Sequence, residues 1–140
     1  MSISQFFQLF ILALPIVLVI DLVWIGIFAK NFYKKHLKEI ARMEGDTMKP
    51  NWAASVLVYL VMISAFILFV LPKIPTDGNF LQAIFWGSVF GLSFSGVYNL
   101  TNYALFAKYP LKVVVVDMTW AFFFSGAIGL IIWNLNNFLS

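Results

Sequence analysis

Four long apolar runs dominate the pattern of hydrophobic and polar positions along the chain. They cover roughly residues 6–29, 52–71, 81–107 and 111–133. Each run is long enough to cross a hydrocarbon core of about 30 Å as a helix. The pattern therefore predicts an all-α integral membrane protein in which residues 1–140 form a single transmembrane domain, a four-helix bundle.

Composition supports this class. Of the 140 residues, 62% are apolar and only 11% are charged, too few charges for the surface of a soluble domain. The first apolar run is about 24 residues long and follows an N-terminal stretch without Lys or Arg, so we expect a retained helix rather than a cleaved signal peptide. The absence of cysteine excludes disulfide exchange, thiolate metal sites and cysteine nucleophiles. We expect no cofactor and no metal.

Positive charge concentrates in two of the three connections between the runs. Eight Lys and Arg residues fall in the first and third connections and one, Lys73, falls in the second. The eight are Lys30, Lys34, Lys35, Lys38, Arg42, Lys49, Lys108 and Lys112. Because cytoplasmic loops carry the excess of basic residues, both termini should lie outside the cytoplasm.

The basic loop at residues 30–50 has a weakly amphipathic pattern. Phe32, Leu37, Ile40 and Met43 fall loosely on one side and the cations on the other. The segment is thus a candidate interfacial helix lying on anionic lipid headgroups. The alternative is a solvated connector that only sets topology.

An internal similarity links the ends of the first and third runs. "IDLVWIGIFAKNF", residues 20–32, aligns with "YNLTNYALFAKYP", residues 98–110, and pairs Asp21 with Asn99. Both helices would run toward the cytoplasm, so the match is consistent with two parallel-duplicated helical hairpins. Chance similarity is the alternative, since Phe and Ala are abundant and the second and fourth runs do not align convincingly.

Small and polar residues recur every fourth position in the last two runs. These stripes are Gly87, Gly91, Ser95 and Asn99 in one helix, and Asp117, Ala121, Ser125 and Gly129 in the next. Such stripes let membrane helices approach closely. Antiparallel packing would place Gly87 against Gly129, Gly91 against Ser125, Ser95 against Ala121 and Asn99 against Asp117.

Two acids lie inside the spans on the cytoplasmic side. Asp21 precedes Lys30 by nine residues and Asp117 follows Lys112 by five, depths of about 13 Å and 8 Å at 1.5 Å per residue. A carboxylate facing lipid at such depth is costly, and apart from Lys112 at the start of the last run no Lys or Arg lies within the spans. Both acids should therefore face the bundle interior, where we expect the amides of Asn99 and Asn102 to hydrogen-bond them.

Each acid is followed three residues later by tryptophan, in "DLVW" at Asp21–Trp24 and "DMTW" at Asp117–Trp120. This spacing puts acid and indole on one helix face. The pattern favours a pocket in which the acids hold a ligand and the indoles wall it, with Ser55 and Tyr59 at the start of the second helix as further candidates. The alternative for the tryptophans is bundle packing or anchoring at the interface.

The motifs "DLVWIG", "PNWAA", "GSVFGLSFSGVYNLTN" and "PLKVVVVDMTW" resemble a family of small bacterial predicted membrane proteins, domain of unknown function 2177. The resemblance covers nearly the whole chain and implies a four-helix protein of the bacterial inner membrane, without an established activity. In that family the third-helix motif usually reads Tyr-Asp-Leu-Thr-Asn, so Asn99 replaces a typical acid here. Asp21 and Asp117 remain as the matching carboxylates.

Three functions fit these patterns. The first is a binding or transport site for a proton, small cation or small solute. The second is a non-catalytic accessory or assembly subunit of a larger membrane complex. The third is a lipid-modifying enzyme using acid–base chemistry at Asp21 or Asp117; the absence of nucleophile, metal and phosphate-loop motifs makes it the least favoured. Expected partners are membrane lipids and either a second copy of the chain or a larger membrane protein, but no nucleic acid.

Overall fold

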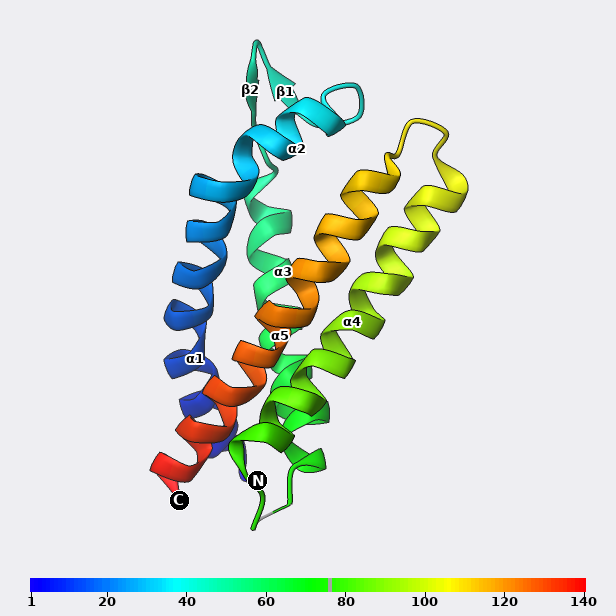
Figure 1. Cartoon of the computed structure of the whole chain (residues 1–140). Helices are drawn as coiled ribbons and strands as arrows, with labels where there is room; N and C mark the ends of the chain where they lie inside the picture. Colours follow the sequence, from blue (N-terminus) through cyan, green and yellow to red (C-terminus); the bar gives the residue numbers. More distant parts are fainter. Residues whose placement is uncertain (76) are drawn as a thin grey trace.

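The computed structural model describes residues 1–75 and 77–140. Over these residues four helical stretches are long and apolar enough to cross a membrane: Ile3–Leu37, Trp52–Lys73, Phe80–Leu105 and Leu111–Leu139. The first comprises α1 (Ile3–Val23), the π-helical segment η1 (Trp24–Ala29) and α2 (Lys30–Leu37). The second comprises α3 (Trp52–Ala65), the π-helical η2 (Phe66–Val70) and the 3₁₀ turn η3 (Leu71–Lys73). The remaining two are α4 (Phe80–Leu105) and α5 (Leu111–Leu139), and the predicted all-α membrane bundle is confirmed (Figure 1).

Polar side chains begin three of the four stretches. The Ser2 hydroxyl accepts a hydrogen bond from the Gln5 amide, and the Asn51 side chain accepts one from the Ala54 amide. Asn79 forms a reciprocal capping box with Gln82 at the start of α4. Because these caps satisfy amides that have no partner within the helix, the helices begin at defined residues.

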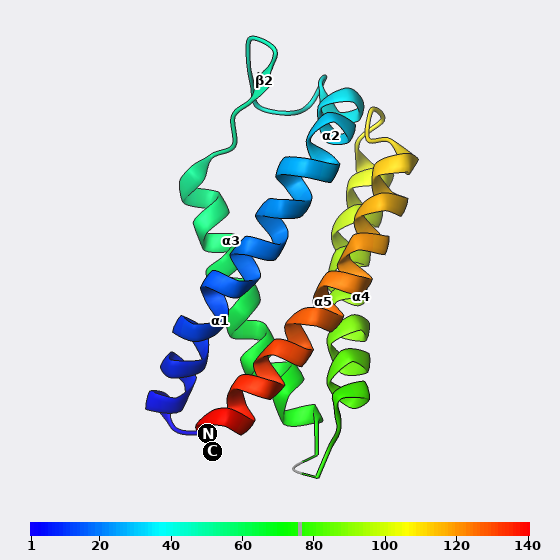
Figure 2. The same ribbon diagram turned by 60° about the vertical axis from the view of Figure 1, so that its left-hand side comes forward.

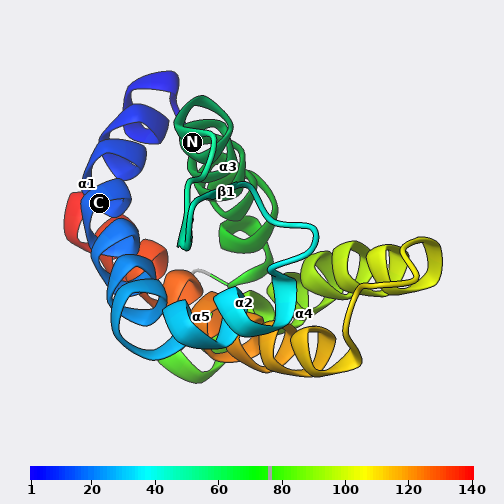
Figure 3. The ribbon, with the colours of Figure 1, turned by 90° about the horizontal axis from the view of Figure 1, so that it is seen from above.

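The first stretch is longer than the expected helix at 6–29. It continues through η1 into α2, which leaves the direction of α1 and crosses above α5 (Figures 1 and 3). Phe32 and Leu37 of α2 pack against Val113 and Val114 of α5. Part of the apolar side of this expected interfacial segment thus covers the protein's own bundle.

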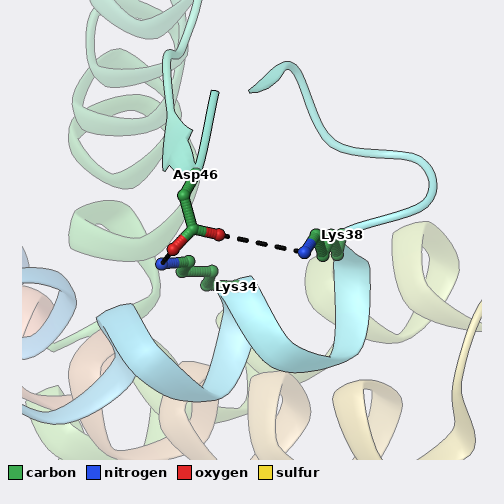
Figure 4. Close-up of polar contacts among 3 residues, drawn as sticks. All are labelled: Lys34, Lys38 and Asp46. Atoms are coloured by element: carbon green, nitrogen blue, oxygen red, sulfur yellow. Dashed lines mark hydrogen bonds and ion pairs between the residues drawn. The ribbon is translucent and has the colours of Figure 1, made fainter. Parts of the chain in front are cut away.

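A two-stranded hairpin in the basic loop was not predicted. Its strands are β1 (Met43–Glu44) and β2 (Thr47–Met48), joined through Gly45, whose φ of 60° is the left-handed conformation that glycine adopts without strain. Asp46 in this turn pairs with Lys34 at 2.6 Å and with Lys38 at 3.8 Å (Figure 4). The hairpin is therefore held over α2 by charge.

An ion pair joins the two loops at one end of the bundle, residues 38–51 and 106–110. We call this end the "basic end" and the opposite end the "terminal end". Lys108 forms an ion pair with Glu39 just beyond α2. At the terminal end Gln5 Nε2 donates to Asn136 Oδ1 at 3.0 Å, and both chain ends lie at this end of the bundle (Figure 2).

Helices α4 and α5 pack along their small residues. A Cβ atom on Gly87 would lie 3.1 Å from the Gly129 Cα and would overlap the Ser125 carbonyl oxygen. A Cβ on Gly91 would overlap the Ser125 side chain. The Ser88 hydroxyl adds a 2.9 Å hydrogen bond to the Phe122 carbonyl across the same interface. Close approach of the two backbones thus depends on hydrogen atoms at these glycines.

The apolar core fills the bundle from its middle toward the terminal end. Its fully buried members come from α1, α3, η2 and α5: Leu9, Ala13, Val17, Ile63, Ile67, Ile128 and Ile132. Seen from the basic end, α3 and α4 stand apart, with α5 and α1 on one side of the space between them (Figure 3). Toward the terminal end the second stretch approaches the other helices, and η2 contacts both α4 and α5 there.

We predict that Gly87→Ala destabilises the bundle by about 1–3 kcal/mol, because the new methyl group meets partner backbone rather than a movable side chain. Gly26→Ala is the matched control: nothing lies within 4 Å of its Cβ position. Unfolding titrations in mixed SDS micelles measure both variants. Equal stability of the two would show that α4 and α5 do not pack through Gly87.

The Glu39–Lys108 pair predicts a small pH dependence of stability. The Lys108 ammonium, by hydrogen bonding first and by charge second, holds the pKa of Glu39 below its usual 4.5. A lowered folded-state pKa stabilises the protein above about pH 4.5, and this contribution is lost as pH falls through the folded-state value. Glu39→Gln should thus have a slightly lower melting temperature at pH 7, small because both side chains are about two thirds exposed, and the difference should close in acid. An unchanged difference down to pH 3 would contradict this assignment.

Candidate functional site

A cavity of about 250 Å³ lies between the four helical stretches, on the basic side of the apolar core. Both membrane acids line it, Asp21 from α1 and Asp117 from α5. The remaining polar side chains in its lining are those of Ser95, Tyr98, Asn99 and Ser125. Sequence stretches almost 100 residues apart thus meet at one place.

Asp21 accepts hydrogen bonds on both carboxylate oxygens. The Tyr59 hydroxyl of α3 donates to Oδ2 at 2.6 Å, and the Trp120 indole Nε1 of α5 donates to Oδ1 at 3.3 Å. The acid of α1 therefore holds a phenol and an indole from two other helices, which fixes its orientation toward the bundle interior.

The hydrogen-bond donor of Asp117 comes from the basic end of the bundle. Its Oδ1 accepts a hydrogen bond from the hydroxyl of Tyr33, which lies on α2. Because α2 reaches this position only by continuing α1 through η1, the length and bend of the first helical stretch decide which donor Asp117 receives. A helix ending at residue 29 would not carry Tyr33 there.

The side chain of Asn99 is 1% exposed and has its own partners. Its amide Nδ2 donates to the carbonyl and the hydroxyl oxygens of Ser95, both at 3.1 Å, and its Oδ1 accepts from the Tyr109 hydroxyl at 2.8 Å. Among the described residues, the hydrogen bonds at the two acids come from phenols and an indole. A hydrogen bond from the Asn99 or Asn102 amide to an acid stays a prediction. Asn99 still shares the cavity with both acids.

The two tryptophans of the repeated Asp-x-x-Trp spacing stack on each other. The ring centroids of Trp24 and Trp120 are 4.3 Å apart with planes 5° from parallel, and Phe124 continues the stack 5.2 Å beyond Trp120. Trp120 lines the cavity, and both Trp24 and Trp120 line an apolar groove between α1 and α5. Among the described residues, the buried Trp24 Nε1 has no hydrogen-bond partner.

Other predicted site residues lie at different places. Ser55 donates to the Asn51 carbonyl at 3.0 Å at the start of α3, and the structure puts neither Ser55 nor Asn102 in the described lining of the cavity. Tyr59 contacts the site by its hydrogen bond to Asp21. The small-residue stripes form part of the cavity lining, which includes Gly91, Ser95, Ala121 and Ser125. Gly87 and Gly129 contact each other on the terminal side of the cavity.

Sequence reasoning missed Tyr33, Tyr98 and Tyr109. Tyr33 lies in the basic stretch, for which the sequence predicts an interfacial helix or a solvated connector, and Tyr109 lies between two apolar runs. Aromatic residues near membrane boundaries usually indicate interfacial anchoring, so their position alone gave no signal for a buried phenol.

The charge balance of the site is its main chemical property. Within the described chain, two carboxyl groups line the cavity and no Lys or Arg does. The hydrogen bonds that the acids accept come from neutral phenols and an indole. Over residues 1–75 and 77–140, no group of three or more His, Cys, Asp or Glu side chains is arranged to hold a metal ion. The arrangement can therefore take up a proton or a positively charged group.

We predict that Tyr109→Phe destabilises the protein by about 1–3 kcal/mol, because it leaves the buried Oδ1 of Asn99 without its donor. Tyr103→Phe is the matched control at a side chain that is 47% exposed. Thermal unfolding in detergent micelles measures both. A Tyr109→Phe protein as stable as Tyr103→Phe would argue against this hydrogen bond.

The chain matches a family of known sequences. A family model described as a predicted membrane protein, DUF2177, matches residues 6–134. No curated protein matches the chain. No solved structure matches it either.

Proposed function

Because the chain belongs to the DUF2177 family of predicted membrane proteins, we propose a function that operates within the bilayer: the protein binds a proton or a small cationic solute between Asp21 and Asp117. One observation carries the proposal. Two acids from different helices share a cavity whose described lining contains no basic side chain.

The hydrogen bonds around the acids leave room for such a ligand. An ionised carboxylate has about four lone-pair sites, and Asp21 uses two of them for Tyr59 and Trp120. Neutral donors orient the acids without cancelling their charge. A cation or proton entering the cavity would therefore supply the missing positive charge, which is worth more in this environment of low dielectric constant than in water.

The charge distribution supports an orientation for the site. The basic end carries the two Lys- and Arg-rich connections, so we place it at the cytoplasmic face of a bacterial inner membrane, with both termini on the other side. The cavity then lies in the cytoplasmic half of the bilayer. Toward the terminal end it stops at the buried core of Ile63, Ile67 and Ile128. Because the cavity does not extend past this core, the structure supports binding of a ligand, the first step of transport, more directly than transport itself.

We predict that Asp21→Asn and Asp117→Asn each weaken binding of radiolabelled methylammonium at least tenfold, because each removes one of the two charges that attract it. A tenfold loss corresponds to about 1.4 kcal/mol. Scintillation proximity assays on the purified protein measure binding, and liposomes report pH-dependent uptake. Asp77→Asn, which changes an exposed acid outside the site, should behave as wild type.

Unchanged binding and flux in both variants, with unchanged stability, would refute the proposal. Two other outcomes would point elsewhere. A stable complex with a larger membrane protein that survives both substitutions would favour an accessory role. A co-purifying lipid that only the wild-type protein alters chemically would favour an enzyme.

A further inference from the structure

The cavity has a mouth on the lipid-facing surface between α3 and α4. Three of its lining residues are also widely exposed: Val61 of α3 at 60%, and Phe94 and Tyr98 of α4 at 60% and 58%. These side chains belong to membrane-spanning helices, so the surface that they expose faces hydrocarbon. The site is thus accessible from the bilayer.

The route from the basic end is covered. There α2 crosses above α5 (Figure 3), and Phe32, Tyr33 and Leu37 pack on Tyr109, Val113 and Val114 of the opposite connection and helix. The Tyr33 hydroxyl hydrogen-bonds Asp117 itself, and the Glu39–Lys108 pair ties the loop after α2 to the α4–α5 connection. In this conformation the lateral mouth is therefore the more direct way to the acids.

The polarity of the cavity changes between its mouth and its inner part. Its apolar wall includes Phe66, Phe90 and Phe124, and the two carboxyl groups form a single charged pole. This arrangement complements a molecule with one cationic group on an apolar body. A freely hydrated inorganic ion would gain little from such a wall, because its apolar side chains cannot replace the water that the ion loses.

The size of the cavity constrains the ligand further. A volume of about 250 Å³ corresponds to about eight water molecules at roughly 30 Å³ each. That space holds an ammonium group and a few carbon atoms, so a longer chain would leave through the mouth into the lipid. A primary ammonium also offers three donors, which match the free lone pairs of the two acids and of Asn99 Oδ1.

We propose that the site binds a lipophilic amine, a primary ammonium on a hydrocarbon chain, which enters sideways from the bilayer between α3 and α4. This inference rests on the proposed function, because the same two acids hold the charged group. It adds the chemical class of the ligand and its route of entry.

The test uses dodecylamine as the probe and the full chain in lipid nanodiscs. Native mass spectrometry should show one bound dodecylamine, at least tenfold tighter than methylammonium, and no bound dodecanol, which has the same chain without the charge. Asp21→Asn should abolish this binding and Asp77→Asn should not. Val61→Trp, which fills the mouth, should slow association at least tenfold. Val56→Trp is the matched control, since Val56 is 56% exposed on the same helix and lies outside the described lining.

A second measurement needs no substitution at the mouth. Dodecylamine carrying a photoreactive diazirine on one of the carbons nearest its ammonium group should label wild-type peptides containing residues 61–66 and 90–98, and excess dodecylamine should suppress the labelling. Labelling of α2 instead, or labelling that dodecanol suppresses equally, would overturn the inference.

The two proposals fail differently. If methylammonium binding depends on Asp21 and Asp117 while dodecylamine binds no tighter and Val61→Trp has no effect, the lateral entry of an amphiphile is wrong and the proposed function stands. If neither amine depends on the acids, both proposals fall.

Discussion

Two carboxyl groups inside a bilayer without a basic neighbour impose the constraint on which the rest of the structure depends. Each must be turned inward and hydrogen-bonded, because lipid offers no donor. The fold meets this requirement with donors from three other parts of the chain: Tyr59 and Trp120 for Asp21, and Tyr33 for Asp117. These contacts connect α1, α2, α3 and α5 on the basic side of the apolar core.

The two π-helical segments fit this arrangement. A π turn changes which side chains face the bundle after it, and such turns occur often at functional sites. η1 begins at Trp24, directly after the turn that carries Asp21, and precedes the bend that brings Tyr33 to Asp117. η2 begins at Phe66, a residue that lines the cavity and belongs to the core below it. η2 therefore lies where the packed core meets the cavity, and η1 lies on the basic side of Asp21, before the bend into α2.

The sequence was sufficient to predict the parts of this fold that depend on local pattern. Run length and hydropathy identify membrane helices because every span must satisfy its own backbone. The four-residue spacing of Gly87 and Gly91 predicts close packing because only small side chains allow it. The hydrogen-bond donors of the two acids could not be predicted from local pattern. Tyr33 and Asp117 are 84 positions apart, and the residues around Tyr33 are mostly basic. The partners of Asn99 were hard to predict for a related reason, since an amide can bond its own helix, at Ser95, as well as a neighbouring acid.

One stripe of small residues on α4 and α5 has two consequences at different depths. At Gly87 and Gly129 the opposing backbones meet, with no side chain between them. Further toward the basic end, the lining of the cavity includes Gly91, Ala121 and Ser125. The same absence of bulk therefore closes the helix pair at one level and leaves space beside it at the next, where α3 stands away from α4. A bundle with large side chains along this stripe would separate the two helices and fill the space around Asp21 and Asp117. The packing of α4 on α5 and the existence of the site are, in this physical sense, one feature of the sequence.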